Sequence, residues 1–135
     1  MNENKDFDMI IIGGGIIGCM LSRYLAKYKL RILLIEKEAD IGSATSAANT
    51  AIVHPGYDAI SGSLKAKLTV AANPLWDQLA SELHFAFERC GDYVVAIGKK
   101  EMPKLDELLE RGKLNGVPGM YLLSAEEMRK RETNI

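Results

Sequence analysis

A glycine-rich turn follows a short apolar run near the start of the chain, and this combination restricts the folds that the chain can adopt. Residues 9–12 are Met-Ile-Ile-Ile, and the glycines at 13, 15 and 18 have the Gly-x-Gly-x-x-Gly spacing. In a strand–turn–helix unit each of these glycines has a role. Gly13 permits the sharp turn, Gly15 lets a pyrophosphate approach the backbone, and Gly18 lets the helix pack closely on the sheet. The phosphates would lie at a helix N-terminus, where free N–H groups and the helix dipole favour negative charge.

The residues around this turn predict a complete βαβ unit. The pattern indicates a strand over 7–12, a helix over 16–29 and a second, parallel strand over 30–35 that ends at Glu36. An acid roughly 20 residues after the glycines completes the dinucleotide-binding fingerprint. Glu36 is expected to accept hydrogen bonds from both ribose hydroxyls of an adenosine, and its charge would repel a 2′-phosphate. The sequence therefore favours a dinucleotide other than NADP, with a βαβ unit that binds no ligand as the alternative.

Composition and charge argue against a metalloprotein, a nucleic-acid-binding protein and a membrane-spanning protein. The chain has 135 residues, a net charge of −1 and two cysteines, Cys19 and Cys90, that belong to no metal-ligand pattern. We therefore expect no metal site, no nucleic-acid partner and a reducing, cytoplasmic setting. The longest uncharged apolar run, 9–21, is too short to span a bilayer, and the residues before it do not resemble a secretion signal. Peripheral contact with the inner face of a membrane stays open.

The stretch 37–57 is rich in small and hydroxyl-bearing residues and has no regular period. Small side chains let the backbone approach a flat ligand, while hydroxyl and amide groups can bind phosphates. We interpret this stretch as a ligand-lining loop with a short helix over 46–49, and an exposed linker is the alternative.

The remainder of the chain predicts helices interrupted by short strands. Leucines and alanines recur at helical spacing over 61–83, and Pro74 should kink or divide that helix near Asn73. Ser124 and Glu127 form a capping box that would open a final helix. The further elements that we expect are a strand over 92–97, a helix over 102–114, a strand over 120–123 and a helix over 125–132.

The motif residues resemble a known family. Residues 8–18 together with Glu36 and Lys37 resemble the FAD-binding start of the D-amino-acid-oxidase-like flavoprotein oxidoreductases. The resemblance is nearer still to the bacterial FAD-dependent glycerol-3-phosphate dehydrogenases, particularly the anaerobic type, and to the L-2-hydroxyglutarate oxidases. The stretches that carry this second resemblance are 46–58, 62–68, 89–96 and 114–119.

The resemblance implies an α/β fold with a Rossmann-like FAD-binding βαβ unit and an incomplete three-layer sheet. It also implies a division into 1–85, the N-terminal part of an FAD-binding domain, and 86–135, the start of a substrate or cap domain. We expect the chain to be the N-terminal part of a larger enzyme and to be inactive alone. The cofactor-binding residues that we predict are Gly13, Gly15, Ile16, Ile17, Gly18, Glu36, Lys37, Thr45, Ser46, Asn49 and Thr50.

The chemistry that the resemblance implies is oxidation of a secondary alcohol beside a phosphate or carboxylate. Hydride would pass to the flavin, most simply from sn-glycerol 3-phosphate to give dihydroxyacetone phosphate, with a further electron acceptor such as a quinone or oxygen. His54 is the candidate base, because imidazole suits proton exchange near neutral pH, or else it positions the flavin. The alternatives are an L-2-hydroxyglutarate oxidase, another 2-hydroxy-acid or amine oxidase, and a non-catalytic nucleotide-binding module; a homo-oligomer is compatible with each.

Overall fold

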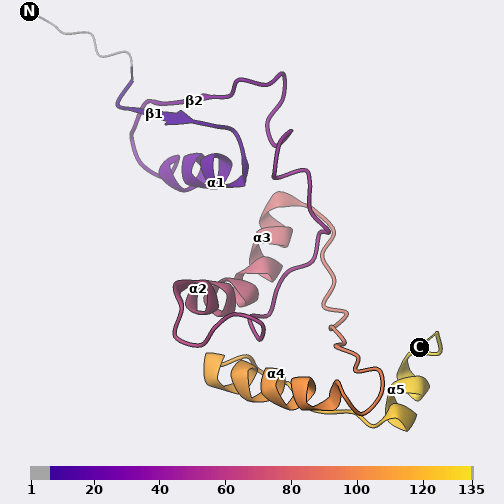
Figure 1. Ribbon diagram of the computed structural model, residues 1–135. Helices are drawn as coiled ribbons and strands as arrows, with labels where there is room; N and C mark the ends of the chain where they lie inside the picture. The colour runs from indigo at the N-terminus through magenta and orange to yellow at the C-terminus, as the bar shows by residue number, and fades with distance from the viewer. Residues whose placement is uncertain (1–6, 135) are drawn as a thin grey trace, which may run out of the picture. The chain divides into compact units, whose positions relative to one another are not determined.

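The structure is a computed structural model that describes residues 7–134. Backbone contacts divide the chain into two compact units, the first ending at Ile52 and the second beginning at Val53 (Figure 1). The predicted division between residues 85 and 86, which concerns domains of the larger enzyme, stays a prediction.

The first unit is the predicted βαβ unit. Strand β1 (Met9–Ile12) is followed by helix α1 (Ile16–Leu25) and strand β2 (Ile32–Ile35), and the strands pair in parallel (Figure 1). Their register aligns Met9 with Ile32 and Ile12 with Ile35, so that both strands end at the same edge. This confirms the predicted α/β class. Helix α1 is shorter than predicted, because the chain leaves it at Ala26 through turns rather than continuing to residue 29.

The first helix of the second unit is divided. Helix α2 (Leu64–Ala72) leads into a 3₁₀ turn, η1 (Asn73–Leu75), and then into α3 (Trp76–Leu83). The predicted break at Pro74 is confirmed, since proline lacks the N–H that an uninterrupted helix needs. The Ser63 hydroxyl accepts a hydrogen bond from the Ala66 N–H at 3.1 Å and so caps the start of α2.

Two further helices follow a long extended segment (Figure 1). Helix α4 (Met102–Asn115) carries proline in its first turn and ends at Gly116, which has a φ of 82°. Helix α5 (Ala125–Arg131) begins with the predicted capping box between Ser124 and Glu127. Both helices were predicted from sequence, and both are confirmed to within one residue at each end.

Three smaller predictions are wrong. No strand forms over 92–97 or 120–123, and the sheet in the described residues consists of β1 and β2 alone. Extended segments become strands only when a neighbouring backbone pairs with them, and within residues 7–134 no strand pairing involves either segment. The expected helix over 46–49 is absent because side chains bind the local backbone there; the Asn49 amide, for example, donates to the Ser46 carbonyl at 2.6 Å.

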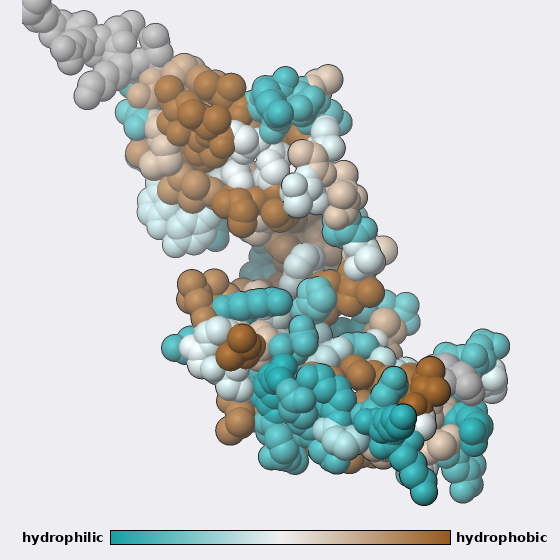
Figure 2. Space-filling view, in the orientation of Figure 1, coloured by the Kyte–Doolittle hydropathy of each residue, from teal (hydrophilic) through white to brown (hydrophobic). Residues whose placement is uncertain are grey.

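Much apolar surface stays accessible on the first unit. Figure 2 shows a dense hydrophobic patch on this unit, whereas the surface around α4 is strongly hydrophilic. Ile12 is 87% exposed and Ile17 is 79% exposed, although both belong to regular elements. Within residues 7–134 no helix is long and apolar enough to cross a bilayer, and α4, the longest, has 14 residues.

Candidate dinucleotide site

The glycine turn joins β1 to α1 with close backbone contacts. Gly13 has a φ of 103°, and its N–H donates to the Ile35 carbonyl at 2.7 Å, which ties the turn to the end of β2. A Cβ added to Gly18 would lie 1.9 Å from the Gly13 carbonyl oxygen. The sharp turn and the close packing that the spacing assigns to these two glycines are therefore both present.

The start of helix α1 receives a hydroxyl group from a distant loop. Gly15 is the N-cap residue, and the next N–H, that of Ile16, donates to the Ser46 Oγ at 2.9 Å. A Cβ on Gly15 would lie 3.3 Å from the same oxygen. The backbone of Gly15 does not need positive φ, so the close approach of Ser46 is what favours glycine here.

The carboxylate of Glu36 is held by backbone N–H groups at the end of β2. Its Oε2 accepts from the Gly14 N–H at 2.6 Å, and its Oε1 accepts from Lys37 at 2.8 Å and from Glu38 at 3.0 Å. The N–H groups of Glu38 and Gly14, and to a lesser extent that of Lys37, hold the pKa of Glu36 below its usual range. A carboxylate offers about four acceptor positions, so Oε2 retains one position for a ligand hydroxyl.

Gly14, which was not among the predicted residues, supports the site by holding Glu36 in place. Its N–H binds Glu36, and its carbonyl accepts from the Gly42 N–H at 2.9 Å. An added Cβ would lie 2.9 Å from Ile41 Cγ2 and 3.2 Å from Glu36 Oε2. The available signal was the run of three glycines where the fingerprint requires only two.

These groups surround one cavity of about 420 Å³ in the first unit. It brings together the turn, the end of β2 and the loop after it, and it contains several predicted cofactor-binding residues. Its lining consists of Ile12, Gly13, Gly15, Ile35, Glu36, Lys37, Gly42, Ser43, Ala44, Thr45 and Ser46. Apolar side chains, exposed hydroxyl groups and a carboxylate in one concave site fit the adenosine and phosphate part of a dinucleotide.

Five predicted cofactor-binding residues lie outside the lining of this cavity. Ile16, Ile17 and Gly18 lie on α1, and Thr50 is exposed on the loop. Asn49 stabilises that loop, because its Oδ1 accepts from the Ala51 N–H at 2.7 Å and its amide binds Ser46. Direct contact of these five residues with a cofactor stays a prediction.

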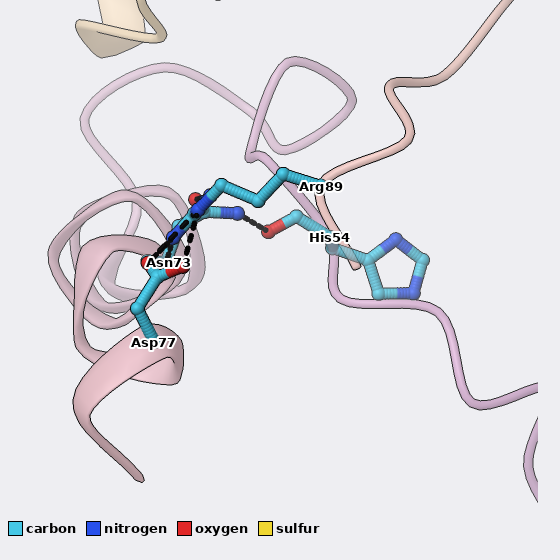
Figure 3. Close-up of polar contacts among 4 residues, drawn as sticks. All are labelled: His54, Asn73, Asp77 and Arg89. Carbon is cyan, nitrogen blue, oxygen red and sulfur yellow. Dashed lines mark hydrogen bonds and ion pairs between the residues drawn. The ribbon is translucent and has the colours of Figure 1, made fainter. Parts of the chain in front are cut away.

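The predicted catalytic residue, His54, belongs to the second unit. It lines a smaller cavity of about 70 Å³ together with Tyr57, Lys65 and Thr69. Its carbonyl oxygen accepts a hydrogen bond from Asn73 Nδ2 at 3.4 Å, while its ring points away from that contact (Figure 3). Its role as a base or as a flavin-positioning residue stays a prediction.

The fold and the cavity are together those of a dinucleotide-binding unit. A parallel βαβ unit whose glycine turn, helix N-terminus and strand-end acid meet at one cavity is a dinucleotide-binding unit. Comparison with known proteins makes this specific: the sequence model of the family described as "FAD dependent oxidoreductase" (DAO) matches residues 8–135. The chain belongs to this family, and membership confirms FAD as the predicted cofactor.

Individual relatives agree with this assignment. The chain is 48% identical over 129 residues to a glycerol 3-phosphate dehydrogenase of Caloramator mitchellensis, covering 96% of this chain and 27% of that protein. It is 36% identical to human mitochondrial L-2-hydroxyglutarate dehydrogenase, covering 96% and 28%. A solved structure of dithionite-reduced L-alpha-glycerophosphate oxidase from Mycoplasma pneumoniae with FAD bound matches with a TM-score of 0.69 and 30% identity, covering 92% and 33%. The chain thus spans about a quarter to a third of the length of these relatives.

Proposed function

We propose that the protein carrying this chain is an FAD-dependent dehydrogenase that oxidises sn-glycerol 3-phosphate to dihydroxyacetone phosphate. The observation that carries the proposal is the 48% identity to a glycerol 3-phosphate dehydrogenase over 96% of the chain. The likeness to a glycerophosphate oxidase structure with FAD bound supports the same substrate. The cavity at the glycine turn supplies the site where this chain would hold the cofactor.

The residues of the first unit would bind the adenosine and pyrophosphate part of FAD. Backbone N–H groups at the start of α1 would receive the phosphates, and Ser46 and Thr45 would add hydroxyl donors beside them. The free acceptor position on Glu36 would bind one ribose hydroxyl. Lys37 adds a cation at the same rim, although its ammonium lies 3.3 Å from Glu38. When bound, FAD supplies the hydride acceptor.

His54 would act on the reacting side of the cofactor. Its imidazole would either accept the proton of the substrate hydroxyl or donate a hydrogen bond that positions the flavin ring. The substrate's anionic group would require cationic side chains, and we assign none in this chain.

A specific observation also favours a second substrate, L-2-hydroxyglutarate. The chain is 36% identical to a dehydrogenase of that acid, with the same coverage of this chain. Both substrates are secondary alcohols beside an anionic group, so the first unit would serve either enzyme without change. Glycerol 3-phosphate is preferred because the identity is higher by 12 percentage points.

The finer properties of the intact enzyme are also proposals. It would pass electrons to a second acceptor, such as a quinone or oxygen, as the dehydrogenase and oxidase relatives imply. A cytoplasmic location with peripheral contact at the inner membrane face would suit a quinone acceptor. Self-association would be compatible with the exposed apolar surface of the first unit.

The experiment is a turnover assay of the purified intact protein after reconstitution with FAD. Glycerol 3-phosphate and L-2-hydroxyglutarate are supplied separately with a dye acceptor, and Glu36→Ala provides the variant impaired in cofactor binding. Turnover of glycerol 3-phosphate alone supports the proposal. Turnover of L-2-hydroxyglutarate alone would assign the second substrate, and failure to retain FAD would contradict both.

A further inference from the structure

The most elaborate polar cluster in the second unit lies beside His54 and is centred on Arg89 (Figure 3). The Nε of Arg89 lies 3.0 and 2.9 Å from the two carboxylate oxygens of Asp77, and Nη2 completes this ion pair. Its Nη1 donates to Asn73 Oδ1, and its Nη2 donates to the Asn73 carbonyl, both at 3.0 Å. One guanidinium therefore joins a carboxylate, a side-chain amide and a main-chain carbonyl.

The contact with Arg89 fixes which way the Asn73 amide faces. A guanidinium can only donate hydrogen bonds, so the group facing it must be the amide oxygen. The Asn73 Nδ2 is consequently directed to the opposite side, where it donates to the His54 carbonyl at 3.4 Å. The two bonds are made by the two ends of one rigid amide, and the first determines the second.

The surroundings of Arg89 hold its guanidinium in place. The group lies over the ring of Phe87 at 5.3 Å, and that ring lies 6.1 Å from the ring of Trp76 on α3. Asn73 lies at the break between α2 and α3, where Pro74 removes a helical N–H. The break and the two neighbouring rings together present Asn73 and Asp77 to the same cation.

We propose that Arg89 is a positioning residue, which orients the Asn73 amide and through it holds the main chain at His54 so that the imidazole faces away from the cluster. The inference rests on the proposed function only in assigning His54 to the flavin side. Lysine could not replace Arg89, because an ammonium cannot engage the Asp77 carboxylate and both Asn73 oxygens in one plane.

The decisive variant is Asn73→Asp in the intact protein. A carboxylate keeps an acceptor for Arg89 but has no N–H for the His54 carbonyl, so the variant retains the cluster and removes the positioning bond. Gln78→Glu is the matched control, since it makes the same amide-to-carboxylate change on the exposed face of α3 and likewise removes an amide hydrogen bond, that from Nε2 to the Glu82 carboxylate at 2.6 Å. Arg89→Lys tests the need for the planar fork.

The first readout needs neither FAD nor substrate. NMR spectra of histidine-labelled apoprotein would follow the ring signal of His54, assigned through His54→Gln. The ring signal of His84, which terminates α3, serves as an internal reference. We expect Asn73→Asp and Arg89→Lys to shift or broaden the His54 signal, while the His84 signal stays as in the wild type and the melting temperature falls no further than in Gln78→Glu.

The second readout is steady-state kinetics of the FAD-loaded protein. Displacing a group beside the reacting atoms should lower kcat roughly ten- to a hundredfold for Asn73→Asp while KM and FAD affinity change little. An unchanged His54 signal would overturn the positioning role. A joint loss of both histidine signals and of thermal stability would also overturn it, by showing that the cluster only maintains the fold. Absence of any turnover with either substrate would count against the proposed function, while the NMR result would still decide the role of Arg89.

Discussion

At the scale of single residues, two glycines of the turn lack room for a side chain for different reasons. Gly18 is excluded from bearing a side chain by a backbone oxygen, whereas Gly14 is crowded by the side chains of Ile41 and Glu36. Backbone atoms cannot yield without moving the strand, but side chains can rotate. The two positions should therefore respond differently to the same substitution.

We predict that Gly18→Ala prevents stable folding of the βαβ unit, while Gly14→Ala folds and binds FAD more weakly. In Gly14→Ala the new methyl group would displace Glu36 from the turn. Circular dichroism and flavin fluorescence titration of the two variants check this. Equal FAD affinity in Gly14→Ala and the wild type would contradict the role given to Gly14.

Removing the charge of Glu36 should weaken the binding of FAD. Glu36→Gln places an amide beside three N–H donors, so we expect FAD affinity to fall roughly tenfold or more. Glu38→Gln is the control, because Glu38 pairs with Lys37 at the surface instead of binding the turn. Similar affinities of the two variants would contradict the assignment.

Because the pKa of Glu36 is lowered in the folded protein, the stability of the first unit should depend on pH. A depressed carboxyl pKa adds stability that is present above the unfolded value of about 4.5 and is lost as pH falls through the folded value. The thermal stability of the wild type should therefore fall at acid pH as Glu36 becomes protonated. This loss should be absent in Glu36→Gln. A pH series of thermal melts measures the difference.

At the scale of elements, the second unit is held by side chains that bind loop backbone. Asn115, at the end of α4, donates to the carbonyls of Gly56 and Ala59 at 2.9 and 2.7 Å. These two bonds bridge more than fifty residues of sequence. They place the segment that follows His54 against a helix.

We predict that Asn115→Ala destabilises this unit by about 1–3 kcal/mol, because two carbonyls lose their donors. Urea unfolding gives the measurement, and Lys113→Ala is the control on the exposed face of the same helix. A loss equal to that of the control would show that the two bonds contribute nothing.

The segment expected to form a strand over 92–97 is held by single contacts instead. The Tyr57 hydroxyl donates to Asp92 at 3.0 Å, and burial together with this carboxylate raises the pKa of Tyr57 to about 12. A raised pKa means that the stability is present below the unfolded value of 10.0 and is lost as pH rises toward 12. Tyr57→Phe should flatten the stability profile above pH 10.0, as thermal melts at alkaline pH would measure; an unchanged profile would contradict this.

Helices and the βαβ unit could be predicted because their signals are local. The glycine spacing, the Ser124 capping box and the break at Pro74 each lie within a few residues of the element that they define. Contacts between residues far apart in the sequence leave no local pattern. The hydrogen bond from Ile16 to Ser46, 30 residues away, could therefore not be predicted. The predictions of strands over 92–97 and 120–123 were wrong for the same reason. Whether a segment forms a strand depends on a neighbouring backbone, and the sequence of the segment does not contain that information.

At the scale of the whole molecule, the first unit leaves many large apolar side chains exposed. Ile12 and Ile17 are its most exposed large apolar residues, and Figure 2 shows a hydrophobic patch on part of this unit. We predict that the 135-residue chain expressed alone self-associates and has no dehydrogenase activity. Size-exclusion chromatography and the dye assay check this, and an active monomer would contradict it.

Under the proposed function, this chain holds the FAD of an enzyme that oxidises glycerol 3-phosphate. The most direct measurement is the visible absorbance of FAD bound to the intact protein, recorded without oxygen while substrate is added. We predict that glycerol 3-phosphate bleaches the flavin band in the wild type and that Glu36→Gln retains little flavin to bleach. A protein that binds FAD but keeps its full absorbance with glycerol 3-phosphate would contradict the proposed substrate.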